Sequence, residues 1–267
     1  MPRLVLVEGK TGAGKSTITK YLKRCGYARH SIDDYIREHF LDLLCEGGVG
    51  KITRLLPFGR EGGMKVWTRF YAGIGGQISY TPEEVESAFF AYQSETNLSD
   101  EERLYINLWK MIRKRDARYT LDTALPLFGK HLKGKILSPE ERIHIGYALF
   151  NAYLGERDKS LSEGEDVALD ALVEPMVRAH CLNVPDTGGE PVQKYLIRLE
   201  ADNDVAERRK INDGMDPEKA KKRVRRELDY SVPKIRGLVI QSYQNNDDDL
   251  KKTCGDLRRL LELPAPL

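Results

Sequence analysis

No stretch of this 267-residue sequence is apolar for long enough to cross a membrane. A transmembrane helix needs about 20 consecutive, mostly apolar residues, and charged residues interrupt every apolar run well before that length. The chain also leads directly into a short strand-like run at residues 4–7, which leaves no room for a secretory signal. We therefore expect a cytoplasmic protein that does not contact membranes.

Cysteine is scarce, and the spacing of the cysteines is irregular. The four residues of this type are Cys25, Cys45, Cys181 and Cys254. Structural zinc sites use closely spaced pairs, and disulfide frameworks belong to short, cysteine-rich secreted chains. We expect four free thiols, and neither a zinc site nor a set of disulfides.

An excess of charge of one sign is also missing. The 43 lysines and arginines nearly balance the 41 acidic residues, which leaves a net charge of +2. Such a balance argues against attraction of nucleic acid by the whole surface, although it permits a local basic patch. The length suits one large domain, or a core with an insertion.

The most informative feature present is the motif Gly-Lys-Thr-Gly-Ala-Gly-Lys-Ser at residues 9–16. A strand-like run precedes it, and apolar residues with helical spacing follow it. The glycines allow the backbone to curl around an anion, so that its N–H groups and the helix N-terminus face a phosphate. Lys15 is predicted to bridge the β- and γ-phosphates of ATP, and Ser16 to hold Mg²⁺. The predicted nucleotide-binding residues are Gly9, Thr11, Gly12, Ala13, Gly14, Lys15, Ser16 and Thr17.

Strand-like runs alternate with helical segments at both ends of the chain, in residues 1–45 and 161–267. This alternation predicts an α/β fold, a three-layer core with a parallel sheet. The predicted strands include 4–7, 166–170, 192–199 and 238–240, a further short segment ends at Ser31-Ile32-Asp33-Asp34, and a closing helix spans 250–261.

Residues 46–160 lack strand alternation and carry repeated helix-start signals. Ser138-Pro139-Glu140-Glu141 combines an N-cap serine, a proline at the first helical position and a capping box. Similar signals begin at Thr81 and Ser99. We expect a mostly helical insertion that contributes to acceptor binding.

Two adjacent acids follow the second predicted strand, at the sheet edge where ligands of open α/β folds bind. Asp34 is the preferred candidate for the base that receives a proton from the attacking acceptor. Asp33 and Arg37 are candidates for acceptor binding. The competing interpretations are that either acid caps the next helix, and that Arg37 lies on a solvated helix face.

Asp170 ends the strand-like run at 166–170, where a carboxylate can hold Mg²⁺ through water or orient the acceptor. It can equally cap the following helix. Arg178, further along that segment, is a weaker candidate for acceptor binding.

A cationic segment after the fourth predicted strand contains Arg208 and Arg209. A turn ending at Met215 separates it from a second helix that is rich in lysine and arginine. Arginines in a mobile segment can close over the phosphates and neutralise the charge of the transferred group. We predict a lid at about 205–232, with a solvated basic face as the alternative.

The insertion has its own mixture of cationic and aromatic residues: Trp109, Lys110, Arg113, Lys114, Arg115, Arg118 and Tyr119. Interleaved cations and rings suit a nucleic-acid surface. The competing interpretation is an amphipathic helix with one solvated face.

These features together resemble the nucleoside monophosphate kinase-like group of P-loop phosphotransferases, especially dephospho-coenzyme A kinases and phage-type deoxynucleoside monophosphate kinases. The similar parts are the loop at residues 9–16, Asp34, the strand and cationic segment from Leu196 to Arg209, and the closing strand and helix. The resemblance covers about 1–45 and 161–267, and implies an ATP- and Mg²⁺-dependent kinase.

The sequence departs from this group in two places. Asn212 stands where the group often repeats an arginine, and the insertion is far larger than the usual acceptor-binding segment. The acceptor is therefore expected to be of nucleotide type, either free or as a hydroxyl group in DNA such as that of a hydroxymethylated base. The alternatives are a kinase of another small metabolite, such as a coenzyme precursor, and a nucleotide-dependent switch or regulatory ATPase.

Overall fold

The structure is a computed structural model. It describes residues 1–31, 34–35, 79–80, 97–100, 103, 107, 120–170, 178, 181–182, 184, 191–225, 232–233, 237–246 and 249–263. The chain forms two compact units, which are described separately. The first comprises 1–30, 158–230 and 235–267, and the second comprises 31–157 and 231–234. The unit boundaries thus lie after His30 and Arg157, whereas the sequence-based boundaries lie at 45/46 and 160/161.

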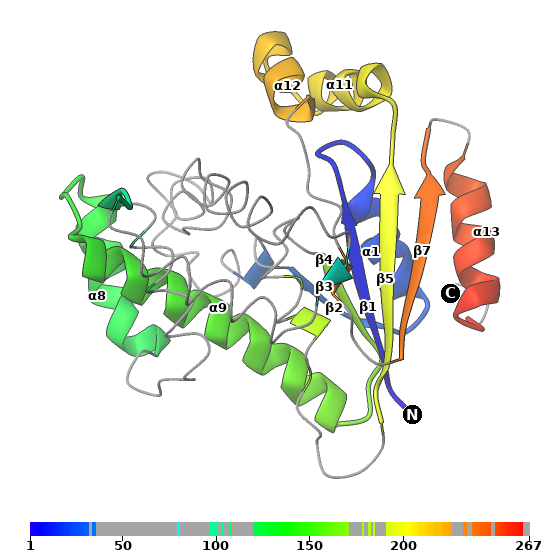
Figure 1. Cartoon of the computed structure of the whole chain (residues 1–267), viewed down its shortest axis with the longest axis horizontal. Coiled ribbons are helices and arrows are strands. Elements are labelled where there is room, and N and C mark those ends of the chain that lie inside the picture. The colour runs from blue at the N-terminus through cyan, green and yellow to red at the C-terminus, as the bar shows by residue number, and fades with distance from the viewer. Residues whose placement is uncertain are drawn as a thin grey trace. The chain divides into compact units, whose positions relative to one another are not determined.

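The first unit contains a five-stranded parallel sheet in the order β2-β4-β1-β5-β7. Its strands are β1 (Arg3–Gly9), β2 (Ala28–Ser31), β4 (Val167–Asp170), β5 (Gln193–Glu200) and β7 (Leu238–Gln244). Figure 1 shows β1, β5 and β7 side by side with their arrowheads pointing the same way. The predicted α/β class with a parallel sheet is confirmed.

The helices of the first unit follow the strands along the chain. Those that lie wholly within the described residues of this unit include α1 (Lys15–Arg24), α11 (Asn203–Asn212), α12 (Pro217–Val224) and α13 (Leu250–Leu260). α12 begins where the sequence predicts a helix start, because Asp216 accepts a hydrogen bond from the Lys219 N–H at 3.0 Å and Pro217 occupies the first position. In Figure 1, α11 lies beyond the carboxyl end of β5.

Both faces of the central strand β1 are buried. Leu4, Val5, Leu6 and Val7 are each 0% exposed, so consecutive side chains are covered on opposite sides of the sheet. A three-layer fold requires this double coverage, and it explains why β1 is an uninterrupted apolar run rather than an alternating one.

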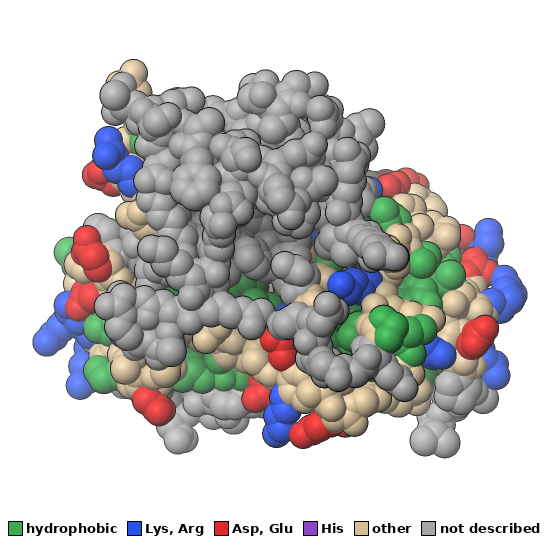
Figure 2. Space-filling view, turned by 60° about the horizontal axis from the view of Figure 1, so that its bottom comes forward, with side chains coloured by type: hydrophobic (Ala, Val, Ile, Leu, Met, Phe, Trp, Pro, Cys, Tyr) green, Lys and Arg blue, Asp and Glu red, His purple; other side chains and the backbone are tan. Residues whose placement is uncertain are grey.

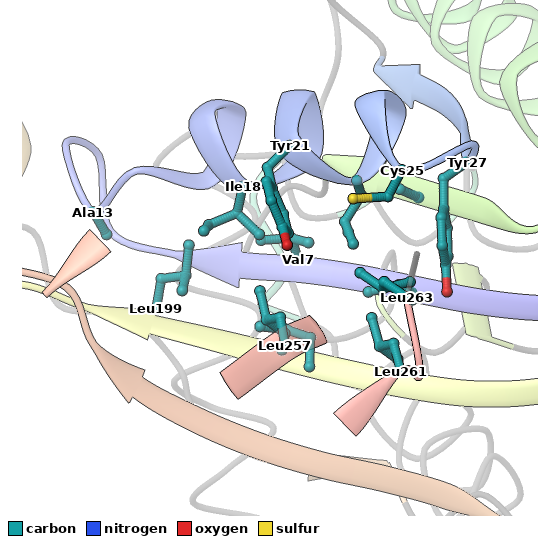
Figure 3. Packing of buried hydrophobic residues seen from close by; sticks show 14 of the residues in the cluster. Val7, Ala13, Ile18, Tyr21, Cys25, Tyr27, Leu199, Leu257, Leu261 and Leu263 are labelled. Carbon is teal, nitrogen blue, oxygen red and sulfur yellow. The ribbon is translucent and has the colours of Figure 1, made fainter. Parts of the chain in front are cut away.

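The core on one face of the sheet contains side chains from α1 and α13 together with the strands. Figure 3 shows Ile18 and Tyr21 of α1 and Leu257 of α13 packed with Val7 and Leu199 of the sheet. Each fully buried aliphatic side chain of this kind contributes about 1.5–3 kcal/mol. This packing holds α1, and therefore the loop before it, against the sheet.

The second unit contains helix α8 (Leu121–Leu132), most of α9 (Pro139–Ser162), and a two-stranded parallel pair of β3 (Ser79–Tyr80) and β6 (Val232–Pro233). The predicted capping box at the start of α9 is confirmed. The Glu141 N–H donates to Ser138 Oγ at 3.2 Å, and the Ser138 N–H donates to Glu141 Oε2 at 2.8 Å. Lys130 of α8 donates to the same carboxylate at 2.7 Å and so joins the two helices.

Candidate functional site

The glycine-rich loop connects the carboxyl end of β1 to the first residue of α1. Gly9 has φ +149°, and a Cβ at this position would lie 2.3 Å from the carbonyl oxygen of Leu199. Gly14, which immediately precedes α1, has φ +93°, and its Cβ would lie 2.3 Å from the amide nitrogen of Asn245. Both positions therefore exclude larger residues, for conformational and for steric reasons. The loop leads directly into the N-terminus of α1, and the N–H groups of a first helical turn are the donors that an anion site uses.

Lys15, the first residue of α1, folds back over the loop. Its ammonium group donates hydrogen bonds to the carbonyl oxygens of Gly9 at 2.8 Å and Lys10 at 3.1 Å. Burial lowers the pKa of Lys15, and the positive charges of Lys210 and Arg223 lower it further. Asp170 and Glu8 act in the opposite direction. The loop therefore holds a cation in a partly desolvated place, where it attracts an anion strongly.

Ser16 and Asp170 meet beside the loop. Ser16 Oγ donates to Asp170 Oδ2 at 2.9 Å. Asp170 is the last residue of β4, and its register partner on β1 is Val7, so the two strands end at the same edge of the sheet. A hydroxyl and a carboxylate at this distance are the oxygen ligands that Mg²⁺ prefers, directly or through water. The residues present thus fit the predicted metal site.

Arg29 of β2 belongs to the same cluster, although sequence reasoning did not identify it. Its Nη2 lies 3.9 Å from Asp170 Oδ2, and its Nε donates to Thr19 Oγ1 of α1 at 3.0 Å. The sheet order places β2 next to β4, and this order cannot be read from the chain. The sequence feature that could have identified Arg29 was the position of an arginine within a predicted strand.

The cationic segment reaches the loop from α11. Arg209 Nη1 donates to the Gly12 carbonyl oxygen at 3.0 Å, whereas Arg208 is exposed on the same helix. Arg225, at the end of α12, donates to Glu207 Oε1 at 2.9 Å, which ties the two helices together. The structure therefore brings Arg209 to the loop, whereas Arg208 is an exposed residue of α11.

Asn245 follows β7 and was also missed by sequence reasoning. Its side-chain amide donates to the Ala13 carbonyl oxygen at 2.5 Å, and its backbone N–H donates to Glu200 at 2.6 Å. The side chain is 1% exposed. Asn245 thus links the end of β7 to the loop through a hydrogen bond. The sequence feature that could have identified it was its position directly after the last predicted strand.

Arg178 is buried against Glu8, a residue of β1, rather than on an open surface. It is 0% exposed, and its Nε lies 2.5 Å from Glu8 Oε2. The other oxygen of this carboxylate accepts a hydrogen bond from Arg198 Nε, also at 2.5 Å. The structure assigns Arg178 a supporting contact, and acceptor binding by Arg178 stays a prediction.

Asp34 belongs to the second unit, and its backbone N–H lies 3.5 Å from Ser31 Oγ. Next to it, burial raises the pKa of Tyr35 to about 12, and the negative charge of Glu156 on α9 adds to this shift. Three of the predicted features lie outside the residues that the structure describes: Asp33, Arg37 and the basic run at 109–119. Their proposed roles stay predictions.

Positive and negative side chains are mixed on the described part of the surface that Figure 2 shows. Figure 2 shows lysine and arginine side chains interspersed with acidic ones on the described part of one face. Among the described residues, no helix combines the length and the apolar character that crossing a bilayer demands.

Comparisons with known proteins add little. No family model matches the sequence, and no curated protein matches it. One solved structure that resembles the chain is the crystal structure of TT1252 from Thermus thermophilus, with 15% sequence identity over 99% of each chain and a TM-score of 0.40. A similarity of this size supports no conclusion on function. The function is therefore inferred from the geometry of the site alone.

Proposed function

We propose that this protein is an ATP- and Mg²⁺-dependent kinase that transfers the γ-phosphoryl group to a nucleotide-type acceptor. The observation that carries the proposal is the hydrogen bond of 2.9 Å between Ser16 and Asp170, next in sequence to a half-buried lysine on a glycine-rich loop. A hydroxyl and a carboxylate for Mg²⁺, a cation for the β- and γ-phosphates and a helix N-terminus are the groups that phosphoryl transfer uses. The acceptor is a free nucleotide or a hydroxyl group in DNA.

The roles of the residues follow from where their groups lie. Lys15 and the loop N–H groups would hold the phosphates, and Ser16 and Asp170 would hold Mg²⁺, whose charge would help to neutralise the transferred group. Arg209 already reaches the loop, so that it is close to the place where charge spreads during transfer. The protein's contribution is therefore positioning and neutralisation, without a covalent step.

Hydrogen exchange tests nucleotide binding and the predicted lid together. Residues 203–225 carry many cations and pack through few buried apolar side chains, chiefly Val205, Ala206, Ala220 and Val224. We expect amides in the loop and in this segment to exchange more slowly once a nonhydrolysable ATP analogue and Mg²⁺ are added. Amides of α13 provide an internal reference. Unchanged exchange in both regions at saturating analogue would count against nucleotide binding at the loop.

Asp34 is proposed as the base, and Asp33 as a weaker partner in acceptor binding. Asp34→Asn preserves the shape of the side chain while removing its charge and most of its basicity. We expect this variant to lose about 10²-fold in kcat at saturating ATP, which is within the range of general-base catalysis. Asp33→Asn is the matched control, with the same chemistry one position earlier. A larger loss of kcat in Asp33→Asn would reverse the assignment.

A further inference from the structure

The aspartate that begins α11 does not cap its own helix. Asp202 occupies the N-cap position with extended backbone angles, and its carbonyl oxygen accepts the first helical hydrogen bond from the Ala206 N–H at 2.9 Å. An aspartate in this position ordinarily accepts a further hydrogen bond, through its side chain, from an N–H of the first turn. Asp216 does so at the start of α12. The side chain of Asp202 makes no such bond, and its carboxylate is used elsewhere.

The carboxylate of Asp202 binds the end of β7 instead. Its Oδ1 accepts a hydrogen bond from Gln244 Nε2 and its Oδ2 accepts one from Asn246 Nδ2, each at 3.1 Å. The backbone N–H of Asp202 donates to Asn246 Oδ1, also at 3.1 Å, so Asp202 and Asn246 form a reciprocal pair. We name Asp202, Gln244 and Asn246 the strand-end clasp. The clasp lies where β5 and β7 end together, because Glu200 and Gln244 are register partners.

A cap and the strand-end clasp do different things for α11. A cap within the helix stabilises its first turn by about 1 kcal/mol but does not relate the helix to any other element. The clasp joins the first residues of α11 to a neighbouring strand, and it uses groups of Asp202 and Gln244 that are exposed to competing water. What the clasp adds over a cap is therefore the position of α11.

That position matters because α11 lies directly on the glycine-rich loop. Gly12 has φ +86°, and a Cβ there would lie 2.7 Å from the carbonyl oxygen of Ala206. Lys10 Nζ donates to Asn203 Oδ1 at 3.2 Å, and Arg209 Nη1 donates to the Gly12 carbonyl oxygen at 3.0 Å. The three residues of α11 that meet the loop are spaced three apart, as on one face of a helix. A shift of α11 would therefore move Arg209 relative to the loop.

The end of β7 is tied to the same loop. Asn245, which lies between two members of the strand-end clasp, donates to the Ala13 carbonyl oxygen at 2.5 Å. The loop, α11 and the end of β7 are thus joined in pairs by hydrogen bonds. The clasp is the pair that contains no loop residue, so it can be changed without altering any residue that is predicted to bind nucleotide.

We propose that Asp202 and Asn246 are positioning residues for nucleotide binding, whose reciprocal pair sets the place of α11 and so holds Arg209 at the loop. The proposal rests on the proposed function, since it concerns the same loop and the same arginine. Asp202 and Asn246 act through Arg209, and not through contact with the nucleotide.

The reciprocal pair can be broken and restored without changing its composition. Asp202→Asn keeps a residue suited to the N-cap position, but it leaves one amide donor of β7 without an acceptor in either orientation of the new amide. Asn246→Asp sets two carboxylates against each other. The exchange variant, which combines Asp202→Asn with Asn246→Asp, again places an amide opposite a carboxylate. It retains acceptors for Gln244 and for the backbone N–H of residue 202, and it has the net charge of the wild type.

The experiment measures the affinity of the full-length protein for a fluorescent, nonhydrolysable ATP analogue with Mg²⁺. Each single variant should bind the analogue about three- to tenfold more weakly, as the loss of one or two hydrogen bonds implies. The exchange variant should bind like the wild type. Removal of a negative charge near bound phosphates would by itself strengthen binding, so weaker binding by Asp202→Asn reports position. Asp204→Asn is the charge-matched control on an exposed residue of the same turn, and should not weaken binding.

A second comparison tests whether the clasp acts through Arg209. Arg209→Ala should itself weaken binding by about tenfold or more, because hydrogen bonds to charged groups are strong. Adding Asp202→Asn to Arg209→Ala should cause no further loss, since the group that the clasp positions is already gone. General destabilisation predicts instead that the two losses add.

The possible results separate this inference from the proposed function. Failure of the wild type to bind the analogue would overturn the proposed function, and the inference with it. Binding by the wild type, with unchanged affinity in both single variants, would overturn the inference alone. So would an exchange variant as weak as the single variants, or a full further loss from Asp202→Asn in the Arg209→Ala background. Weaker single variants, a restored exchange variant and no further loss in that background would support it.

Discussion

Replacing Lys15 by alanine is expected to lower the rate of phosphoryl transfer by about 10²-fold or more, without loss of the fold. The side chain lies on the loop, where its ammonium bonds only to the carbonyl oxygens of Gly9 and Lys10 among the contacts described. It contributes no apolar packing to the core, so that its removal should leave the melting temperature close to that of the wild type. Both effects follow from the position of Lys15 between the loop and the first turn of α1.

The loss should appear mainly in kcat. Charge on the transferred group is redistributed in the transition state, and a cation in a partly desolvated site stabilises it more strongly than it would in water. Lys20→Ala provides a matched control, because Lys20 is an exposed lysine of the same helix. Steady-state kinetics of the two variants give the comparison. Near-normal turnover by a folded Lys15→Ala protein would remove Lys15 from the mechanism.

The second large effect is expected at Asp170. Asp170→Asn removes the carboxylate charge that faces Ser16 at 2.9 Å, while it preserves the size of the side chain. We expect the Mg²⁺ concentration needed for half-maximal activity to rise by about 10- to 100-fold, as is usual when a group that orients a metal site is lost. ATP-dependent activity is measured over a range of free Mg²⁺ concentrations.

A neighbouring acid provides the control for this variant. Asp166 lies immediately before β4 and pairs with Arg3, away from the loop. Asp166→Asn changes the charge of the protein by the same amount, and its Mg²⁺ dependence should match that of the wild type. An equal shift in both variants would mean that the effect arises from general destabilisation. No shift in Asp170→Asn would remove this carboxylate from the metal site.

The local parts of this structure could be predicted from the sequence. The strand, loop and helix around residues 9–16 follow from an apolar run, glycines and helical spacing, all of which are read within a few residues. The start of α9 follows in the same way from Ser138, Pro139 and Glu141, because a capping box closes over three positions. Asp170 was identified because an acid ended a strand-like run.

The contacts that hold the loop could not be predicted, because they join distant positions. Glu8 and Arg198 are 190 positions apart, and they meet only because β1 lies beside β5. Asn245 reaches the Ala13 carbonyl oxygen across 232 positions. Arg29 reaches Asp170 because β2 neighbours β4. Periodicity identifies strands but not their order in the sheet, and the partners of charged side chains depend on that order.

The position of Arg178 illustrates the same limit. An arginine in a segment after a strand-end acid suggested an anionic acceptor, but the structure pairs this arginine with Glu8 and buries it completely. The sequence contained both charges without any indication that they meet. A buried acid within an apolar strand, as in Val7-Glu8-Gly9, is the signal that would have suggested a buried cationic partner.

Transfer of label from γ-labelled ATP tests the central claim most directly. The wild-type protein is incubated with Mg²⁺, labelled ATP and separate panels of nucleosides, nucleotides, coenzyme precursors, plain DNA and DNA with hydroxymethylated bases. The account predicts that label appears in a nucleotide or in DNA, and that Lys15→Ala lowers the rate of this transfer by about 10²-fold or more. Label recovered only as inorganic phosphate, at a slow rate with every acceptor, would contradict the kinase assignment and indicate a nucleotide-dependent switch instead.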